Sequence, residues 1–225
     1  MSALRLVVAI DGPGGSGKST VARAVAAALE VEHLDTGAMY RAVTLEALRR
    51  GIAADDADAL GALAESLELV VAARVIVDGT DVTEEIRGDE VNANVSVVAA
   101  HQPVRAALVR RQRGWVEARG AGVVEGRDIT TVVLPDAPVK VYLTASETER
   151  ARRRAEEQGL GVGAEPLAAT RASIAQRDEL DSSRAASPLQ VAEGAVVIDS
   201  TDRSAASVIA EILAIAHEAA GKDAT

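Results

Sequence analysis

Gly12-Pro13-Gly14-Gly15-Ser16-Gly17-Lys18-Ser19-Thr20 is the stretch that decides the fold. An apolar run over residues 4–10 precedes it, and apolar residues at helical spacing follow it. The stretch therefore lies at a strand-to-helix turn and fits G-x-x-x-x-G-K-[ST], the pattern of a phosphate-binding loop. Glycines let consecutive backbone N–H groups converge on an anion without Cβ clashes. The helix start adds unpaired donors and the positive end of a dipole.

Two side chains of this loop have expected roles in nucleotide binding. Lys18 would place a compact positive charge on the terminal phosphates, and the Ser19 hydroxyl would ligate Mg²⁺. The alternative is a glycine-rich turn that matches the pattern by chance. Since the strand before it and the helix after it are the context that the motif needs, we interpret the stretch as a phosphate-binding loop.

Composition limits the classes of protein to which the chain can belong. It has 225 residues, 48% of them hydrophobic and 26% charged, which suits one α/β domain with inserts and excludes global disorder. It has no Phe, one Trp and two Tyr, so an aromatic platform for single-stranded nucleic acid is not expected. The net charge of −10 argues against a broad nucleic-acid or anionic-membrane surface. Without Cys there are no disulfides, thiolate metal sites or Cys nucleophile.

Histidines and apolar runs give no sign of a metal centre or of a membrane protein. His33, His101 and His217 lack metal-ligand spacing, and we interpret each as a surface or packing residue. No run of about 18 apolar residues occurs, and the N-terminus enters a strand without a basic leader. We therefore expect a cytoplasmic protein without a nucleic-acid or membrane partner.

Alternating strands and helices indicate an α/β fold. The predicted strands, the last of them interpreted as a core strand, are residues 4–10, 31–34, 123–124, 139–143 and 195–199. Besides the helix that follows the loop, helices are predicted over residues 38–50, 54–66, 88–99, 101–118, an arginine-rich 149–154, 166–181 and from about 204. This order predicts a parallel five-stranded sheet with helices on both faces.

A small β piece and a flexible break interrupt this alternation. Short strands at 69–71 and 75–80, with an Asp-Gly turn, predict an antiparallel insert at about 67–86. Residues 159–163 are interpreted as a flexible break. No internal repeat or linker divides the chain, so we expect a single domain over residues 1–225.

The segment from Asp35 to Arg41 is the first place where a second substrate would bind. It follows the second predicted strand, and ligands bind at the carboxyl ends of strands in open α/β sheets. One of only two tyrosines, Tyr40, lies next to Arg41. An N-cap Thr36, a packed Tyr40 and a solvated Arg41 would explain this segment about equally well.

The helix predicted at 101–118 gives the second cluster. Arg105 falls within its apolar stripe, where it would either snorkel or reach into a cleft. Arg110 and Arg113 project away from the stripe and are better explained as a solvated face.

Arg177 and Asp181 form the third cluster, at positions i and i+4 of the helix predicted at 166–181. An ion pair between them would stabilise the helix by only ~0.2–0.5 kcal/mol. Their position on the packed face favours a cleft instead. Arg184 follows in a predicted loop. Arg127-Asp128, after the strand at 123–124, would form either a turn pair or contacts to a phosphate, a ribose or a base.

Taken together, these segments closely resemble the bacterial cytidylate kinase family of nucleoside monophosphate kinases. The resemblance runs from Ile10 to Thr201 in the family's order, through IDGPGGSGKST, DTGAMYR, DVTEEIR, VRAALVRRQR, EGRD, VVLPDAPVKVYL, QRDELDSSR, SPL and VVIDST. It implies a P-loop fold with a CORE, a monophosphate-binding insert at about 36–105 that includes the β piece, and a LID at about 150–165. It also implies transfer of the γ-phosphoryl group of ATP to CMP, and to dCMP, with Mg²⁺, in pyrimidine nucleotide metabolism. We expect a monomer.

The resemblance also assigns roles to individual residues. Residues 12–20 would bind ATP, with Ser19 on the metal. Residues around CMP would be Thr36, Tyr40, Arg41, Ser96, Arg105, Arg127, Asp128, Arg177, Asp181 and Arg184. Within this set, the base would be read by Ser96, Arg105 and Asp128. The ribose would be held by Arg127, Arg177 and Asp181. Arg41 would contact the phosphate, and Arg184 would contact CMP or lie between the two nucleotides. The implied catalytic cations are Lys18, Arg41, Arg127, Arg184 and a LID arginine, Arg153 or Arg154.

Three positions depart from the family pattern. Thr36 stands where Ser is expected, Thr130 where many relatives have Gly, and Leu180 where an Arg is common. The implied base contacts suit cytosine, because Asp128 can accept from its N4 amino group, whereas uracil would turn an acceptor toward the carboxylate. A site built on paired hydrogen bonds can reject such an analogue by up to ~10⁴-fold, so we expect CMP to be preferred over UMP.

Three other interpretations stay open. Another small-molecule P-loop kinase, of the UMP/CMP or shikimate type, would share the loop and the fold class. A GTPase should carry N-K-x-D and a D-x-x-G switch after a strand, and neither occurs in a suitable place. A nucleotide-binding regulator without turnover is the third.

Overall fold

The computed structural model describes residues 6–159, 163–184 and 187–222, and residues 160–162 of the expected break lie outside this description. The chain forms two compact units, one of Met1–His33 with Gly120–Thr225 and one of Leu34–Arg119. Along the described chain, no helix is both long enough and apolar enough to cross a bilayer.

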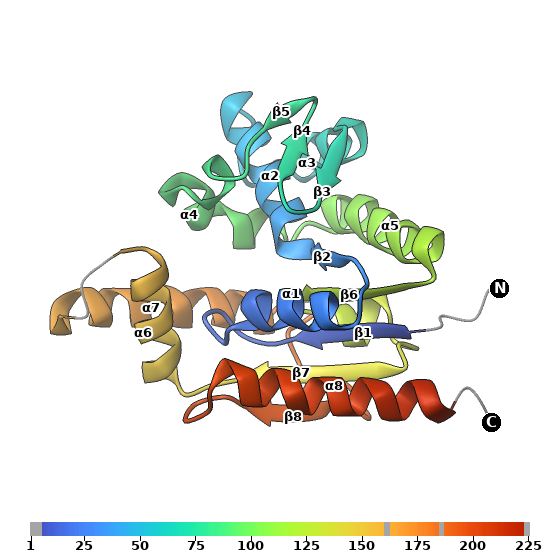
Figure 1. Ribbon diagram of the computed structural model, residues 1–225. Coiled ribbons are helices and arrows are strands. Elements are labelled where there is room, and N and C mark those ends of the chain that lie inside the picture. The colour runs from blue at the N-terminus through green and yellow to red at the C-terminus, as the bar shows by residue number, and fades with distance from the viewer. Residues whose placement is uncertain (1–5, 160–162, 185–186, 223–225) are drawn as a thin grey trace. The chain divides into compact units, whose positions relative to one another are not determined.

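The larger sheet is five-stranded and is built around the strand that precedes the phosphate-binding loop (Figure 1). Its strand order is β2-β6-β1-β7-β8. The strands are β1 (Leu6–Asp11), β2 (His33–Asp35), β6 (Ala121–Gly126), β7 (Val139–Thr144) and β8 (Val196–Asp199). β1 pairs in parallel with β6 on one side, Val8 opposite Val123, and with β7 on the other, Val8 opposite Val139. The predicted five-stranded parallel sheet is confirmed.

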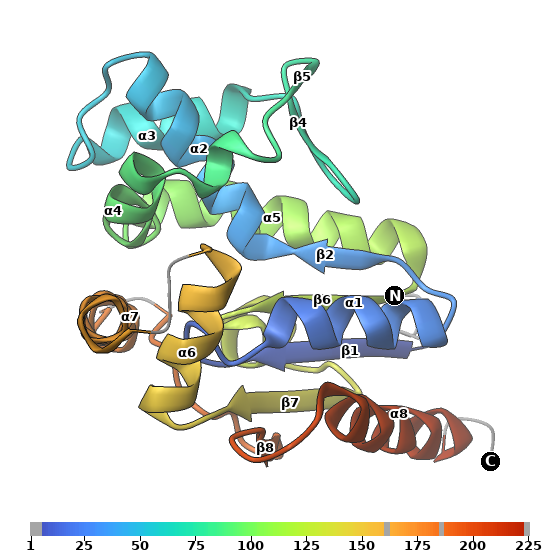
Figure 2. The same cartoon turned by 60° about the vertical axis from the view of Figure 1, so that its left-hand side comes forward.

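Burial explains why the central strand is an unbroken apolar run. Residues Val7–Ile10 of β1 are 0% exposed, as expected for a parallel strand that is covered on both faces. α1 (Lys18–Ala28) and α8 (Ala205–Lys222) pack against each other and contribute Val25 and Ile212 to this core (Figure 2). β8 differs from the predicted core strand: it is an edge strand, in which Ile198 is buried while Val197 is 54% exposed.

Three further elements complete the first unit. The segment after β6 forms one turn of π-helix, η2 (Ile129–Val133), where the sequence predicted no element. α6 (Glu147–Glu157) is the arginine-rich helix, and it packs against α7 (Ala164–Ser182).

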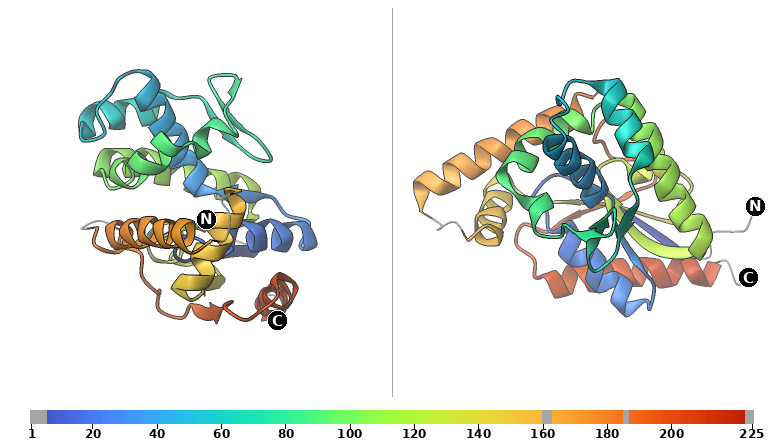
Figure 3. Two further views of the ribbon diagram at one scale, coloured as in Figure 1. Left: turned by 90° about the vertical axis from the view of Figure 1, so that its left-hand side faces the viewer. Right: turned by 90° about the horizontal axis from the view of Figure 1, so that it is seen from above.

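The second unit combines helices with a small antiparallel sheet. Its helices are α2 (Thr36–Arg49), α3 (Ala57–Ser66), the 3₁₀ turn η1 (Glu85–Arg87), α4 (Asp89–Val98) and α5 (Gln102–Arg119). α3 and α5 pack side by side (Figure 3). The predicted β insert is confirmed as β3 (Leu69–Val71), β4 (Val75–Val77) and β5 (Thr80–Asp81), paired antiparallel. Asp78 and Gly79 both have positive φ, as a two-residue hairpin turn requires.

Candidate active site

Close packing makes two glycines of the phosphate-binding loop irreplaceable. A Cβ on Gly12 would lie 2.0 Å from the carbonyl oxygen of Leu143, and one on Gly15 would lie 2.5 Å from that of Arg150. Gly15 also has φ +72°, a conformation that L side chains rarely adopt. The loop thus lies directly against β7 and α6, and it leads into α1, whose N-cap is Gly17. A helix N-terminus in this position favours bound anions.

Lys18 folds back over its own loop. Its Nζ donates to the carbonyl oxygen of Pro13 at 2.8 Å. Burial, followed by the nearby charge of Arg127, lowers the pKa of Lys18 from 10.5 to about 7. A cation this strongly desolvated gains from an anionic partner, which is what a terminal phosphate would supply.

Ser19 and Glu125 place two hard oxygen ligands side by side. Ser19 Oγ donates to Glu125 Oε2 at 2.9 Å, and Glu125 Oε1 lies 2.9 Å from His33 Nε2. Glu125 lies near the carboxyl end of β6, the strand next to β1. A carboxylate and a hydroxyl at the phosphate-binding loop suit Mg²⁺, which binds through one or two protein oxygens and substrate phosphates. Sequence reasoning missed Glu125, although it directly follows the apolar pair Val123-Val124.

Asp11 fixes the segment that carries Arg127 and Asp128. It is 0% exposed and accepts from the backbone N–H of Ile129 at 2.8 Å and of Thr130 at 2.7 Å, and from Thr130 Oγ1 at 2.6 Å. Burial raises the pKa of Asp11, although these hydrogen bonds act in the opposite direction. The threonine at position 130 therefore adds a third hydrogen bond to the buried carboxylate.

A pair of carboxylates on α7 gathers arginines at the mouth of the loop. Arg127 donates from Nη1 to the carbonyl oxygen of Gly12 at 2.7 Å and pairs through Nε with Asp181 at 3.0 Å. Asp178, which sequence reasoning also missed, accepts from the N–H of Gly14 at 3.0 Å and pairs with Arg150. The Asp178 carboxylate is therefore the acceptor for one backbone N–H of the phosphate-binding loop, that of Gly14.

Arg177 does not form the i,i+4 ion pair that was the alternative for it. Asp181 pairs instead with Arg127 and Arg184. Burial lowers the pKa of Arg177 to about 10, and its buried Nε has no hydrogen-bond partner in the described part of the chain. Such a guanidinium favours a ligand that accepts hydrogen bonds.

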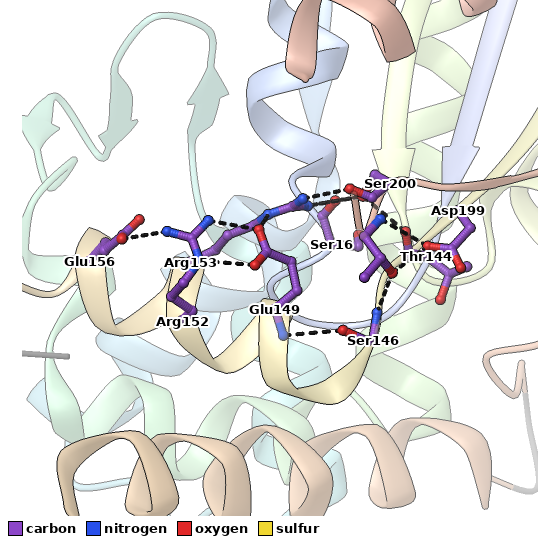
Figure 4. Close-up of polar contacts among 10 residues, drawn as sticks. Ser16, Thr144, Ser146, Glu149, Arg152, Arg153, Glu156, Asp199 and Ser200 are labelled. Carbon is purple, nitrogen blue, oxygen red and sulfur yellow. Dashed lines mark hydrogen bonds and ion pairs between the residues drawn. The ribbon is translucent and has the colours of Figure 1, made fainter. Parts of the chain in front are cut away.

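Arg153 contacts the loop from α6 (Figure 4). Its Nη1 donates to Ser16 O at 3.2 Å and to Ser200 Oγ at 2.9 Å, and its Nε donates to Glu149 at 2.8 Å. Hydrogen bonds from Arg152 and Arg153 lower the pKa of Glu149 to about 2. Arg154 pairs with Glu157 at 3.3 Å. Arg153 thus braces the backbone of the loop, and its role in transfer stays a prediction.

In the second unit, the predicted residues are mostly buried. Tyr40 is 8% exposed and Arg105 only 4%, with the guanidinium 5.6 Å from the centre of the tyrosine ring. Because Arg105 is buried, it does not snorkel. Ser96 is also buried, on α4. Arg41 is not a solvated arginine, since its Nη1 donates to Ile86 O at 3.0 Å and to Asn92 Oδ1 at 2.8 Å.

The cap of α2 differs from one interpretation of the sequence. Asp35, rather than Thr36, is the N-cap, and its side chain accepts from the N–H of Ala38 at 3.1 Å. Thr36 is buried as the first residue of the helix. The predicted site residues thus fall into two groups, one within each unit.

Comparisons with known proteins bear on the family. The family model described as cytidylate kinase matches residues 8–218. The chain is 50% identical over 210 residues to the cytidylate kinase of Mycobacterium avium, covering 91% of this chain and 92% of that one. It is 49% identical over 217 residues to the cytidylate kinase of Bacillus pumilus, covering 93% and 95%.

Solved structures support the fold alone. An uncharacterized protein from Eubacterium ventriosum aligns with a TM-score of 0.56 and 14% identity, covering 95% of this chain and 99% of that one. A gluconokinase from Sinorhizobium meliloti aligns with a TM-score of 0.50 and 16% identity, covering 98% and 96%. The fold is that of P-loop kinases, and on the match over residues 8–218 and the sequence identities, the chain belongs to the cytidylate kinase family.

Proposed function

We propose that this chain transfers the γ-phosphoryl group of ATP to CMP, and also to dCMP, giving ADP with CDP or dCDP. The observation that carries the proposal is the match of residues 8–218 to the cytidylate kinase family. The convergence of Arg127, Arg150 and Arg153 on the backbone of the phosphate-binding loop supports the phosphoryl-transfer part of it. In the metabolism of pyrimidine nucleotides, this would be a cytoplasmic reaction of a monomer.

Phosphoryl transfer asks mainly for positioning and charge. The protein has little covalent chemistry to perform, so placement of the reactants and electrostatic stabilisation dominate. Lys18 would lie on the terminal phosphates of ATP. Besides Lys18, we propose four arginines as catalytic cations that stabilise charge during transfer: Arg41, Arg127, Arg184 and Arg153. Because the acceptor is a phosphate that is largely deprotonated near neutral pH, no dedicated general base is needed.

Ser19 and Glu125 would hold the magnesium ion. Their oxygens lie 2.9 Å apart, and both belong to the hard ligand type that Mg²⁺ prefers. The ion would neutralise charge on the β- and γ-phosphate oxygens. The Ser19 hydroxyl and the Glu125 carboxylate are the residues that would hold it.

Buried polar groups support the proposed recognition of CMP. Ser96, Arg105 and Asp128 are 5%, 4% and 4% exposed, and their side chains carry the donor and acceptor groups that would match the hydrogen-bonding edge of cytosine. We propose that these three residues read cytosine, with Asp128 accepting from the N4 amino group. The remaining proposed contacts of CMP are Thr36, Tyr40, Arg41, Arg127, Arg177, Asp181 and Arg184. We also propose residues 36–105 as the monophosphate-binding insert and residues 150–165 as the LID.

A kinase assay over several acceptors tests the function. With ATP and Mg²⁺, we expect turnover of CMP and dCMP, and much slower turnover of UMP, AMP and shikimate. Equal turnover of CMP and UMP would contradict the role of Asp128. Nucleotide binding without any transfer would instead favour a regulator.

Two variants test the assigned residues. Asp128→Asn keeps the volume but offers an amide that can donate to O4 of uracil, so it should narrow the preference for CMP over UMP. Lys18→Ala should keep CMP binding and lose transfer. Near-normal turnover by Lys18→Ala would refute the role of the loop.

A further inference from the structure

Glu125 uses both of its carboxylate oxygens in hydrogen bonds within the first unit. Oε2 accepts from Ser19 Oγ at 2.9 Å, and Oε1 lies 2.9 Å from His33 Nε2. A carboxylate accepts, so Nε2 is assigned the proton of this bond. The side chain of Glu125 is 3% exposed and that of His33 is 15% exposed, so little water competes for either bond.

The backbone fixes the imidazole in this place. His33 begins β2, which neighbours β6 in the sheet, and the N–H of Val123 donates to Glu32 O at 2.9 Å. This bond lies one residue before His33 and two residues before Glu125. Because the backbone next to both residues is fixed by this hydrogen bond, the His33 imidazole can hold the Glu125 carboxylate in one rotamer.

We propose that His33 is a positioning residue that orients Glu125 for the metal of the nucleotide complex. This inference rests on the proposed role of Ser19 and Glu125 toward Mg²⁺. Held at Oε1 by His33, the carboxylate keeps Oε2 directed at Ser19. Without that donor, a nearly buried carboxylate would lose one partner and could turn away from Ser19. Partners that orient metal-binding side chains typically contribute 10–100-fold in metal affinity.

The experiment separates metal affinity from turnover. Mn²⁺ is titrated into the protein with saturating ADP, and binding is followed by electron paramagnetic resonance; a titration without ADP corrects for other binding. The Mg²⁺ concentration for half-maximal CMP turnover is measured in parallel. His33→Leu removes the donor, His33→Gln retains an N–H donor, and His217→Leu on the exposed face of α8 is the matched control.

We expect His33→Leu to weaken Mn²⁺ binding about 10-fold or more. Its affinity for ADP without metal should not change. His33→Gln should restore most of the loss, and His217→Leu should behave as the unmodified protein. If His33→Leu does not fold, His33→Phe replaces it as a variant without a donor. Unchanged Mn²⁺ affinity in the variant without the donor overturns the inference, as does a loss that His33→Gln does not restore.

The variant Glu125→Gln separates the proposed magnesium role of Glu125 from the proposed positioning role of His33. If it weakens Mn²⁺ binding but His33→Leu does not, only the positioning role of His33 fails. If Glu125→Gln leaves Mn²⁺ affinity unchanged, the proposed magnesium role of Glu125 fails, and the role of His33 fails with it.

Discussion

Replacing Asp11 with Asn should destabilise the protein far more than a change of one atom type suggests. The side chain is fully buried, and its oxygens accept from the N–H of Ile129 and from both the N–H and the hydroxyl of Thr130. An amide retains only one acceptor oxygen. If that oxygen faces Thr130, the new NH₂ group points at the N–H of Ile129, so a buried donor loses its partner.

The cost follows from the number of donors affected. An orphaned buried donor costs about 1–3 kcal/mol, and the two remaining bonds lose the strength that a charged acceptor gives them. Relief of the buried charge offsets part of this loss. We expect a net destabilisation of about 2–4 kcal/mol for Asp11→Asn and about 1–2 kcal/mol for Thr130→Val. The double variant should cost less than the sum, because Thr130 no longer bonds to a charge.

Urea unfolding of the four proteins, followed by circular dichroism, measures these values. Because the pKa of Asp11 is raised on folding, its stabilising contribution is complete below the unfolded pKa and declines as pH rises through the folded one. The deficit of Asp11→Asn should therefore be larger near pH 4 than near pH 8. A cost below about 1 kcal/mol, or exact additivity with Thr130→Val, would refute this reasoning.

Three further predictions concern the phosphate-binding loop. Lys18→Met should abolish transfer and raise the melting temperature of the protein without nucleotide, as measured by scanning calorimetry. Because the pKa of Lys18 is lowered to about 7, this rise in melting temperature should be largest at and below pH 7 and should shrink toward pH 10. ADP binding at pH 8 should take up as much as about one proton, because phosphates restore the charge of Lys18. Titration calorimetry in buffers of different ionisation enthalpy measures this proton uptake, which Lys18→Met should lack. Gly15→Ala should lower kcat/KM for ATP by about 100-fold or more, since its Cβ would lie 2.5 Å from Arg150 O, whereas Gly114→Ala, with nothing within 4 Å, should not.

Local patterns were enough to predict much of the fold. The apolar run of β1 and the glycine-rich loop after it have their determinants within a few residues. The hairpin at Asp78-Gly79 is equally local, because two residues with positive φ set its turn. The order of strands and helices then limited the topology to a parallel sheet.

Features that depend on distant partners could not be predicted in this way. Glu125 reaches Ser19 only because β6 lies beside β1, and strand order is not written in the spacing of residues. The turn η2 depends on Asp11, which lies 118 residues away. Asp181 follows Arg177 at i,i+4 spacing, yet its carboxylate forms an ion pair with Arg127, which follows β6. Helical spacing identifies which side chains of one helix can form an ion pair, but it does not reveal a competing partner from another element.

Asp178 would compete with a nucleotide phosphate for the N–H of Gly14. Its carboxylate is an intramolecular ligand of the Gly14 N–H and of Arg150, so it is present at a high effective concentration. A phosphate that accepted from the Gly14 N–H would have to displace this carboxylate, and the measured affinity for a nucleotide would then be a difference between two binding free energies. Once the product left, the Asp178 carboxylate on α7 would again be the partner of the Gly14 N–H.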